Sequence, residues 1–183
     1  MPEFERRAVP GDTLERDVCA QCGFVAYENP KIVVGSVVVH DGAVLLCRRA
    51  IEPRRGFWTL PAGYLELGET CEEGARREAA EEAGADIALD GVLAMFSISR
   101  IGQVQIIYRA RFADGLARFE AGIESLDVRL FGWEDVPWQE LAFPSVHWSL
   151  DAWRRSGEGR LGPPAGNPAV DPRGVRALPG GGA

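Results

Sequence analysis

Six of the glutamates between Gly63 and Ala85 lie close together with two arginines. They are Glu69, Glu72, Glu73, Glu78, Glu81 and Glu82, with Arg76 and Arg77. Mg²⁺ and Mn²⁺ are hard cations that prefer clustered carboxylate oxygens as ligands. Like charges at this spacing repel one another, so helix stability alone does not explain them. The segment therefore predicts a site for a hard divalent cation.

The local sequence predicts one short helix to carry these side chains. Thr70 is a good N-cap, and Glu73 three positions later completes a capping box. Gly84 can end the helix in the left-handed conformation. At about 100° per residue, three carboxylates fall within roughly a 100° arc on one side of this helix. They are Glu78, Glu81 and Glu82. A solvated acidic helix face is the alternative explanation for the same pattern.

The spacing of the whole segment matches a known signature, G-x5-E-x7-R-E-U-x-E-E-x-G-U, in which U is a bulky apolar residue. Its fixed letters are filled by Gly63, Glu69, Arg77, Glu78, Glu81, Glu82 and Gly84. The two apolar positions hold the smaller Ala79 and Ala85, a difference that concerns packing and not metal ligation. By this signature the chain resembles the Nudix hydrolases.

The resemblance implies an α/β fold, the Nudix α/β/α sandwich with a mixed β-sheet. It implies that Glu78, Glu81 and Glu82 bind Mg²⁺ or Mn²⁺, together with the backbone carbonyl of Gly63. The reaction would be attack of a water molecule on a phosphorus of a pyrophosphate, with the metals neutralising the phosphate oxygens. The number of metal ions stays open.

Supporting and catalytic roles follow from the same resemblance. Glu69 and Arg77 would orient the metal-binding carboxylates as an ion pair. The general base is either a glutamate of the signature, such as Glu78 or Glu82, or a glutamate on a later loop. Glu124 is the candidate on that loop, and a solvated loop residue is the alternative reading of it.

Residues outside the signature narrow the resemblance to a subgroup. The stretches 19–42, 48–70 and 124–145 are similar to a group related to plant FAD and ADP-ribose pyrophosphatases. This implies cleavage of a nucleoside diphosphate linked to another moiety, with FAD or ADP-ribose cut into AMP and a monophosphate. Two features depart from neighbouring subgroups: Ile101 stands where ADP-ribose-specific members commonly have proline, and the SQPWPFPxS element of NADH pyrophosphatases is missing. The alternatives are a non-catalytic nucleotide sensor, or a Nudix hydrolase of NADH or a nucleoside triphosphate.

Substrate contacts are expected in the loop before the signature. Arg54 and Arg55 could hold phosphate, with a solvated basic turn as the alternative. An adenine or flavin ring needs an aromatic platform, for which Phe57 and Trp58 are the main candidates. Aromatic side chains near a sheet are more often part of the core.

The cysteines predict no zinc site. Cys19 and Cys22 form half of a zinc knuckle, but no cysteine or histidine precedes them, and Cys47 and Cys71 are unpaired in the sequence. A structural Zn²⁺ needs four ligands. We expect a degenerate zinc-ribbon hairpin over residues 1–29 and no bound Zn²⁺.

Composition and patterning set the remaining expectations. The net charge of −7 argues against nucleic-acid binding, and no apolar run is long enough to span a membrane. Free cysteines and the missing signal-peptide pattern predict a cytoplasmic protein acting on small molecules. A homodimer stays open. The Nudix domain is expected over 30–156, followed by a Gly/Pro-rich disordered tail over 157–183. The predicted strands are 31–40, 43–50, 57–60, 91–100, 103–112 and 125–133, and a second helix is predicted over 146–155.

Overall fold

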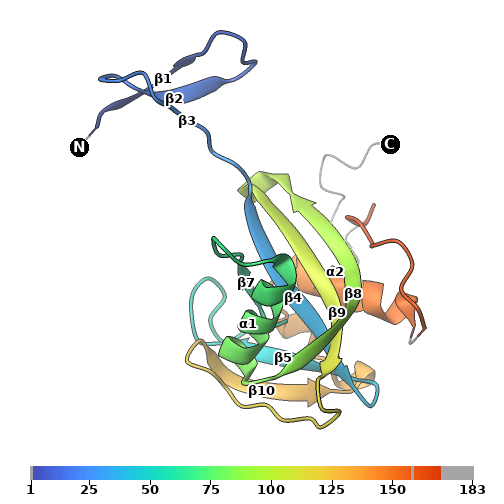
Figure 1. Cartoon of the computed structure of the whole chain (residues 1–183). Coiled ribbons are helices and arrows are strands. Elements are labelled where there is room, and N and C mark those ends of the chain that lie inside the picture. Colours follow the sequence, from blue (N-terminus) through green and yellow to red (C-terminus); the bar gives the residue numbers. More distant parts are fainter. Residues whose placement is uncertain (1, 158, 170–183) are drawn as a thin grey trace. The chain divides into compact units, whose positions relative to one another are not determined.

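The chain is known from a computed structural model that describes residues 2–157 and 159–169. Its internal contacts separate it into two compact units, Met1–Pro30 and Lys31–Ala183 (Figure 1). None of the described helices is long and apolar enough to cross a membrane.

The smaller unit is a three-stranded antiparallel sheet. Its strands are β1 (Phe4–Ala8), β2 (Glu15–Cys19) and β3 (Val25–Ala26), in the order β1-β2-β3. Arg16 forms an ion pair with Asp12 at 2.8 Å and so fixes the turn between the first two strands. Among the described residues of this unit only Val18 and Cys19 are buried, so its hydrophobic core is very small.

The larger unit is built on a mixed sheet with the order β10-β5-β4-β9-β8. These strands are β4 (Lys31–His40), β5 (Ala43–Arg49), β8 (Ile87–Ile98), β9 (Gln103–Phe112) and β10 (Ser125–Phe131). The β4–β9 pair is parallel, whereas the other pairs are antiparallel. Two short strands join the sheet separately: β6 (Trp58–Thr59) pairs with β5, and β7 (Ala62–Tyr64) pairs with β4.

Two helices cover opposite faces of this sheet (Figure 1). They are α1 (Cys71–Ala83) and α2 (Pro144–Ser156). Side chains of β4 alternate between them: Val38 packs in a core cluster with residues of α1, and Val37 packs in the cluster that contains residues of α2. Three short 3₁₀ turns complete the unit: η1 (Ser99–Ile101), η2 (Trp133–Asp135) and η3 (Trp138–Glu140). The predicted α/β sandwich with a mixed sheet is confirmed.

The ends of α1 follow the sequence prediction. The Thr70 side chain accepts the Glu73 backbone N–H, and the Glu73 carboxylate accepts the Thr70 N–H at 2.7 Å, which is a complete capping box. Gly84 ends the helix in the left-handed conformation, with φ of 57°. The helix is thereby held at both ends by local contacts.

The segment after α2 differs from the expected disordered tail in the part that the structure describes. Ala165 pairs with the edge strand β8, since its N–H donates to Leu93 O and its carbonyl accepts from Met95 N. The Asn167 side chain makes two hydrogen bonds with the backbone of Ser97, at 2.8 and 2.9 Å. Within residues 159–169 the chain therefore follows the edge of β8, which offers free backbone groups, and the disordered tail stays a prediction. Residues 170–183 lie outside the described part.

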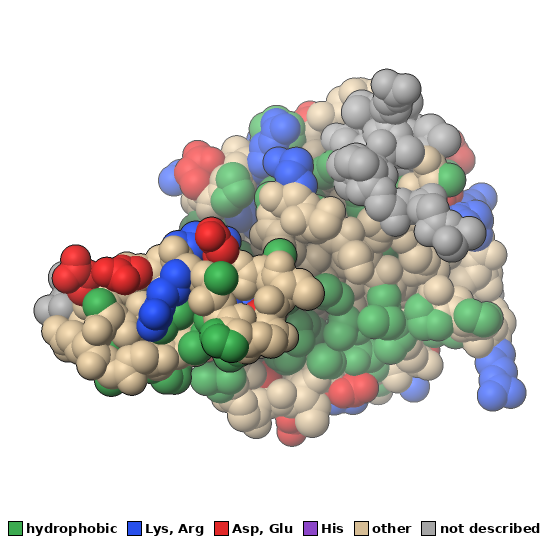
Figure 2. All heavy atoms as spheres, turned by 90° about the horizontal axis from the view of Figure 1, so that it is seen from above, with side chains coloured by type: hydrophobic (Ala, Val, Ile, Leu, Met, Phe, Trp, Pro, Cys, Tyr) green, Lys and Arg blue, Asp and Glu red, His purple; other side chains and the backbone are tan. Residues whose placement is uncertain are grey.

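One apolar area of the sheet is left exposed. By strand register, Ile32 on β4 and Met95 on β8 lie on the same face as α1, with Val104 and Ile106 of β9 beside them. Ile32 and Met95 are both exposed. Figure 2 shows a band of hydrophobic side chains on one face of the molecule.

Candidate active site

Helix α1 turns two glutamates of the signature inward against β7. Glu78 and Glu82 are only 8% and 6% exposed, which is rare for carboxylates. The Ala62 N–H donates to Glu82 Oε2 at 3.0 Å. The Glu78 carboxylate lies so close to Gly63 that a Cβ atom there would overlap it. The glycine of the signature is therefore required by space, because only a bare backbone lets this carboxylate approach β7.

Arg77 binds three carboxylates and a carbonyl at once. It forms a two-pronged ion pair with Glu69, with Nη2 to Oε1 at 2.7 Å and Nε to Oε2 at 3.0 Å. Its Nη1 donates to Glu78 Oε1 at 2.7 Å and to Glu81 Oε2 at 3.0 Å, and its Nη2 donates to the Tyr64 carbonyl at 3.0 Å. This geometry matches the orienting role predicted for Glu69 and Arg77, because the rigid guanidinium fixes the carboxylates relative to β7.

Burial and neighbouring charges shift the pKa values of these groups. Burial raises the pKa of Glu82 to about 8, although the Ala62 N–H and the Arg49 charge oppose the shift. Burial also raises the pKa of Glu78, against the effect of Arg77. Hydrogen bonds from Arg77 and from the Glu66 N–H hold the pKa of Glu69 at about 2. Two neighbouring buried carboxylates with raised pKa values form a place where a cation would replace protons.

The oxygen atoms at this site are the ligands that a hard divalent cation prefers. In the part of the chain that the structure describes, no three metal-binding side chains lie together around one point. Glu78, Glu82 and the Gly63 carbonyl supply oxygen atoms from two adjoining elements. The Glu81 side chain is 60% exposed and is bound to Arg77 instead. Of the three predicted glutamate ligands, two are therefore buried together and Glu81 lies at the rim.

Glu124 lies in the loop between β9 and β10, close to the helix carboxylates. Its negative charge contributes, after burial, to the raised pKa values of Glu78 and Glu82. Its backbone carbonyl accepts the Ala50 N–H at 2.7 Å, which ties the loop to the end of β5. The structure thus brings a fourth carboxylate near the site, and its role as the base stays a prediction.

The predicted substrate residues lie in and beside the loop between β5 and β6. Arg54 and Arg55 are exposed, and the Arg54 guanidinium stacks over the Phe57 ring at 5.2 Å. Trp58 does not share this exposure, because it is 5% exposed and packs edge-on against Phe131 in the core. The indole is a core side chain in this structure, whereas Phe57 is half-buried, and the role of either ring as an aromatic platform stays a prediction.

Arg49 is a site residue that the sequence analysis did not single out. It stands at the end of β5, and its positive charge lowers the pKa of Glu82. The guanidinium also donates to the Pro53 carbonyl at 2.8 Å and lies 5.2 Å from the centre of the Phe143 ring. The sequence places Arg49 a few residues before Arg54 and Arg55. Its proximity to Glu82 depends on how β5 and α1 pack, which the sequence pattern does not contain.

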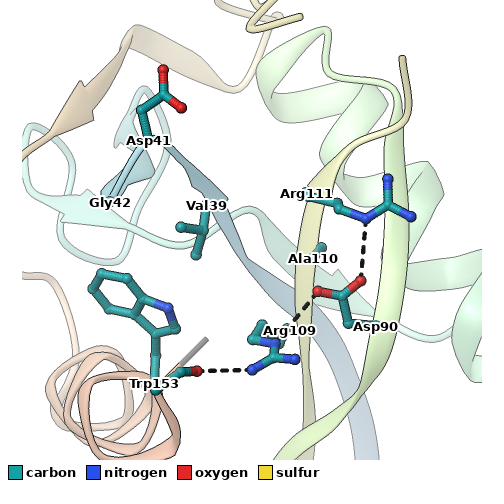
Figure 3. Close-up of a pocket in the computed structure, with 9 residues that line it drawn as sticks. Val39, Asp41, Gly42, Asp90, Arg109, Ala110, Arg111 and Trp153 are labelled. Atoms are coloured by element: carbon teal, nitrogen blue, oxygen red, sulfur yellow. Dashed lines mark hydrogen bonds and ion pairs between the residues drawn. The ribbon is translucent and has the colours of Figure 1, made fainter. Parts of the chain in front are cut away.

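The charged side chains in a second surface pocket of the larger unit are bound to one another and to the backbone (Figure 3). None of the signature glutamates lines it. Arg109 and Arg111 both pair with Asp90 at 3.4 Å, and Arg109 also donates to the carbonyls of Gly157 and Gly159 at 2.9 and 2.8 Å. Arg109 thereby fastens the chain beyond α2 to β9.

Cys19 and Cys22 offer only two thiol ligands. All four cysteines of the chain are free, and Cys47 lies buried in the larger unit. Backbone N–H groups of Cys22 and Gln21 lower the pKa of the Cys19 thiol. Two thiols do not fit the four-ligand set of a structural Zn²⁺. The absence of zinc stays a prediction.

Comparisons with known proteins agree with this geometry. A NUDIX domain model matches residues 29–154, and a zinc-ribbon model described as Nudix N-terminal matches residues 2–28. A MutT-like protein of Streptomyces ambofaciens is 38% identical over 86 residues, which are 47% of this chain and 54% of that protein. The ADP-ribose pyrophosphatase of Methanocaldococcus jannaschii is 29% identical over 121 residues, which are 64% of this chain and 69% of that protein. The chain thus spans about half the length of the first of these relatives.

A solved structure covers both units. The NUDIX hydrolase from Nitrosomonas europaea is 42% identical, with a TM-score of 0.84, and the match covers 90% of this chain and 93% of that one. The NUDIX model alone matches more than half of the chain, over the same residues that carry the glutamate helix and its sheet. The chain therefore belongs to the Nudix family.

Proposed function

We propose that this protein is a divalent-metal-dependent hydrolase that cuts the pyrophosphate bond of a nucleoside diphosphate linked to another moiety. ADP-ribose and FAD are the proposed substrates, and AMP and a monophosphate are the proposed products. The observation that carries the proposal is the pair of buried carboxylates, Glu78 and Glu82, packed against the bare backbone of Gly63. Burying two acidic groups together is costly unless a cation compensates them.

The arrangement of charged groups gives each residue a part in the reaction. Glu78, Glu82 and the Gly63 carbonyl would hold Mg²⁺ or Mn²⁺, and Glu81 would join them from the rim. A metal held there would neutralise the diphosphate and make the attacking water more acidic. Arg77 keeps the carboxylates in place before any substrate arrives.

The chemical step needs a base and a leaving group. Glu124 accepts a proton from the attacking water, whose oxygen bonds to phosphorus while the bridging P–O bond breaks. The oxygen of that bridge leaves with the second phosphate, which yields AMP and a monophosphate. Arg54 and Arg55 on the exposed loop would bind the departing phosphate.

One relative and the sequence outside the signature support the substrate class. The M. jannaschii protein is named as an ADP-ribose pyrophosphatase, and this chain covers 69% of it. The three similar stretches outside the signature point to the FAD and ADP-ribose group. The proposal also includes magnesium as the working ion and a cytoplasmic location. It further includes a homodimer, which the exposed apolar area around Ile32 and Met95 supports.

A substrate panel tests the function. The full chain is incubated with ADP-ribose, FAD, NADH and a nucleoside triphosphate, each with Mg²⁺, with Mn²⁺ and with a chelator, and products are identified by mass spectrometry. We expect metal-dependent AMP from ADP-ribose or FAD, and no turnover by Glu82→Gln. The absence of turnover on every compound with both metals would leave the nucleotide sensor as the better explanation.

A further inference from the structure

The carboxyl end of α1 is closed by a loop that comes some 40 residues later. The Glu82 carbonyl accepts the Gly122 N–H at 3.1 Å, and the Ala83 carbonyl accepts the Glu120 N–H at 2.9 Å. Helix ends leave such carbonyls without partners inside the helix. Gly84 already donates to Ala79 and Ala80 within the helix. The loop therefore pairs two further carbonyls of the last turn, in addition to the bonds that Gly84 makes.

Gly122 lies against α1 with no room for a side chain between the two backbones. A Cβ atom at this position would overlap the Glu81 carbonyl oxygen and would come within 2.9 Å of its carbon. Gly122 is not among the residues with positive φ, so other residues could adopt its backbone conformation. The glycine is required by the space between the two backbones, and any side chain would push the loop away from α1.

The same loop carries Glu124 two residues later. The Ser125 N–H donates to the Gly122 carbonyl at 3.0 Å, and the Ala50 N–H donates to the Glu124 carbonyl at 2.7 Å. These two bonds fix the backbone on both sides of Glu124. A short rigid path therefore runs from the Glu82 backbone through Gly122 to Glu124, so the separation between their carboxylates depends on how closely Gly122 meets α1.

We propose that Gly122 is a positioning residue that sets the distance between Glu124 and the carboxylates of α1. The inference rests on the proposed function, in which Glu124 accepts the proton of the attacking water. Gly122 touches no substrate and acts only through Glu124. A shift of about 1 Å in a reacting group can lower a rate by about a hundredfold.

A double-mutant cycle tests this role in the full-length protein. Glu124→Gln should lower kcat by about a hundredfold or more, and Gly122→Ala by at least about tenfold, with KM changed by less than about threefold. The double variant should have the kcat of Glu124→Gln alone, within about twofold, because Gly122 has nothing further to position. If the two losses multiply, Gly122 acts on something other than Glu124 and the inference fails.

A second readout does not depend on activity. Hydrogen exchange of the metal-free protein should show protected amides at Gly122 and Glu120, and faster exchange at both in Gly122→Ala. Equal protection in the variant and the wild type would overturn the inference even if kcat falls.

Two further variants serve as a control and as an alternative to Gly122→Ala. Ile123→Ala changes a fully exposed side chain next to Gly122, so it should keep wild-type kcat. If Gly122→Ala does not fold, one glycine inserted after Gly122 lengthens the path to Glu124 without filling the contact, and it should cause the same loss. Wild-type kcat in that insertion variant would refute the positioning role. A wild-type protein with no turnover would refute the proposed function instead, so the two failures are distinguishable.

Discussion

Glu82→Gln is expected to make the metal-free protein more stable while abolishing catalysis. Glutamine has nearly the same shape, and its carbonyl can keep the hydrogen bond from the Ala62 N–H. The substitution removes a negative charge from a side chain that is 6% exposed. Under the proposed function this charge serves the metal and not the fold, so removing it should stabilise the metal-free state.

The magnitude follows from the pKa of Glu82, which burial raises from 4.5 to about 8. A carboxyl whose folded pKa is raised contributes stability that is fully present below the unfolded pKa and is lost as pH rises through the folded pKa. Each unit of pKa is worth about 1.4 kcal/mol, so the loss between pH 5 and pH 8 amounts to about 3 kcal/mol as an upper limit. Glu82→Gln lacks this loss. The stability difference between the variant and the wild type should therefore widen by about 1–3 kcal/mol over that range.

Urea unfolding followed by tryptophan fluorescence measures this difference, with a chelator present at every pH. Glu72→Gln is the matched control, because it removes an exposed carboxylate from the same helix and should leave the stability difference constant. Saturating Mg²⁺ should raise the stability of the wild type at pH 8 and have little effect on Glu82→Gln. If the unfolding free energies of Glu82→Gln and the wild type changed with pH in parallel, burial would not raise the pKa of this carboxyl. The prediction would then be wrong.

Three further predictions concern the residues around that carboxylate. Gly63→Ala should lower kcat at least about tenfold, because the new methyl group displaces Glu78; steady-state kinetics check this, and an unchanged kcat would contradict the close approach. Arg77→Lys should lower the unfolding free energy by about 1–3 kcal/mol in urea denaturation, because lysine cannot make the two-pronged pair with Glu69; an unaltered midpoint would contradict it. In wild type the lowered pKa of Glu69, about 2, gives stability that is present above pH 4.5 and is lost as pH falls toward 2. Acid unfolding of Glu69→Gln should lack that component, and a wild-type acid transition in the variant would contradict it.

The helix and its two ends were predictable because their signals are local. The capping box at Thr70 and the left-handed Gly84 depend on contacts within a few residues, so the sequence pattern already contains them. The spacing of the signature also predicts which residues share a side of the helix. The bond between Arg77 and Glu81 also fits this local pattern, because the two residues are four positions apart on the helix. Spacing says nothing of what lies opposite that side, so the exposure of Glu81 was not predictable.

Long-range packing explains two features that the sequence did not predict. Trp58 is adjacent to Phe57 in sequence, but it packs in the core against Phe131. The Gly/Pro-rich composition after 157 predicts disorder, yet Ala165 and Asn167 find backbone partners on the edge of β8. Both outcomes depend on which distant elements lie alongside, and composition does not contain that information.

The contact of Gly122 with α1 was also not predictable from the sequence. A glycine in a polar loop normally indicates a turn, whereas here it marks where two backbones meet. Only the placement of β5, α1 and the loop before β10 distinguishes the two explanations.

The crowding of carboxylates around Arg77 has a consequence for the order of events in the reaction. The site holds Glu69, Glu78, Glu81 and Glu82 on a chain of net charge −7, and the guanidinium of Arg77 is already occupied by Glu69, Glu78 and Glu81. A free diphosphate would meet net repulsion there. Under the proposed function, the cation would therefore have to enter before the nucleotide or together with it, and the concentration of free metal ion would control substrate entry.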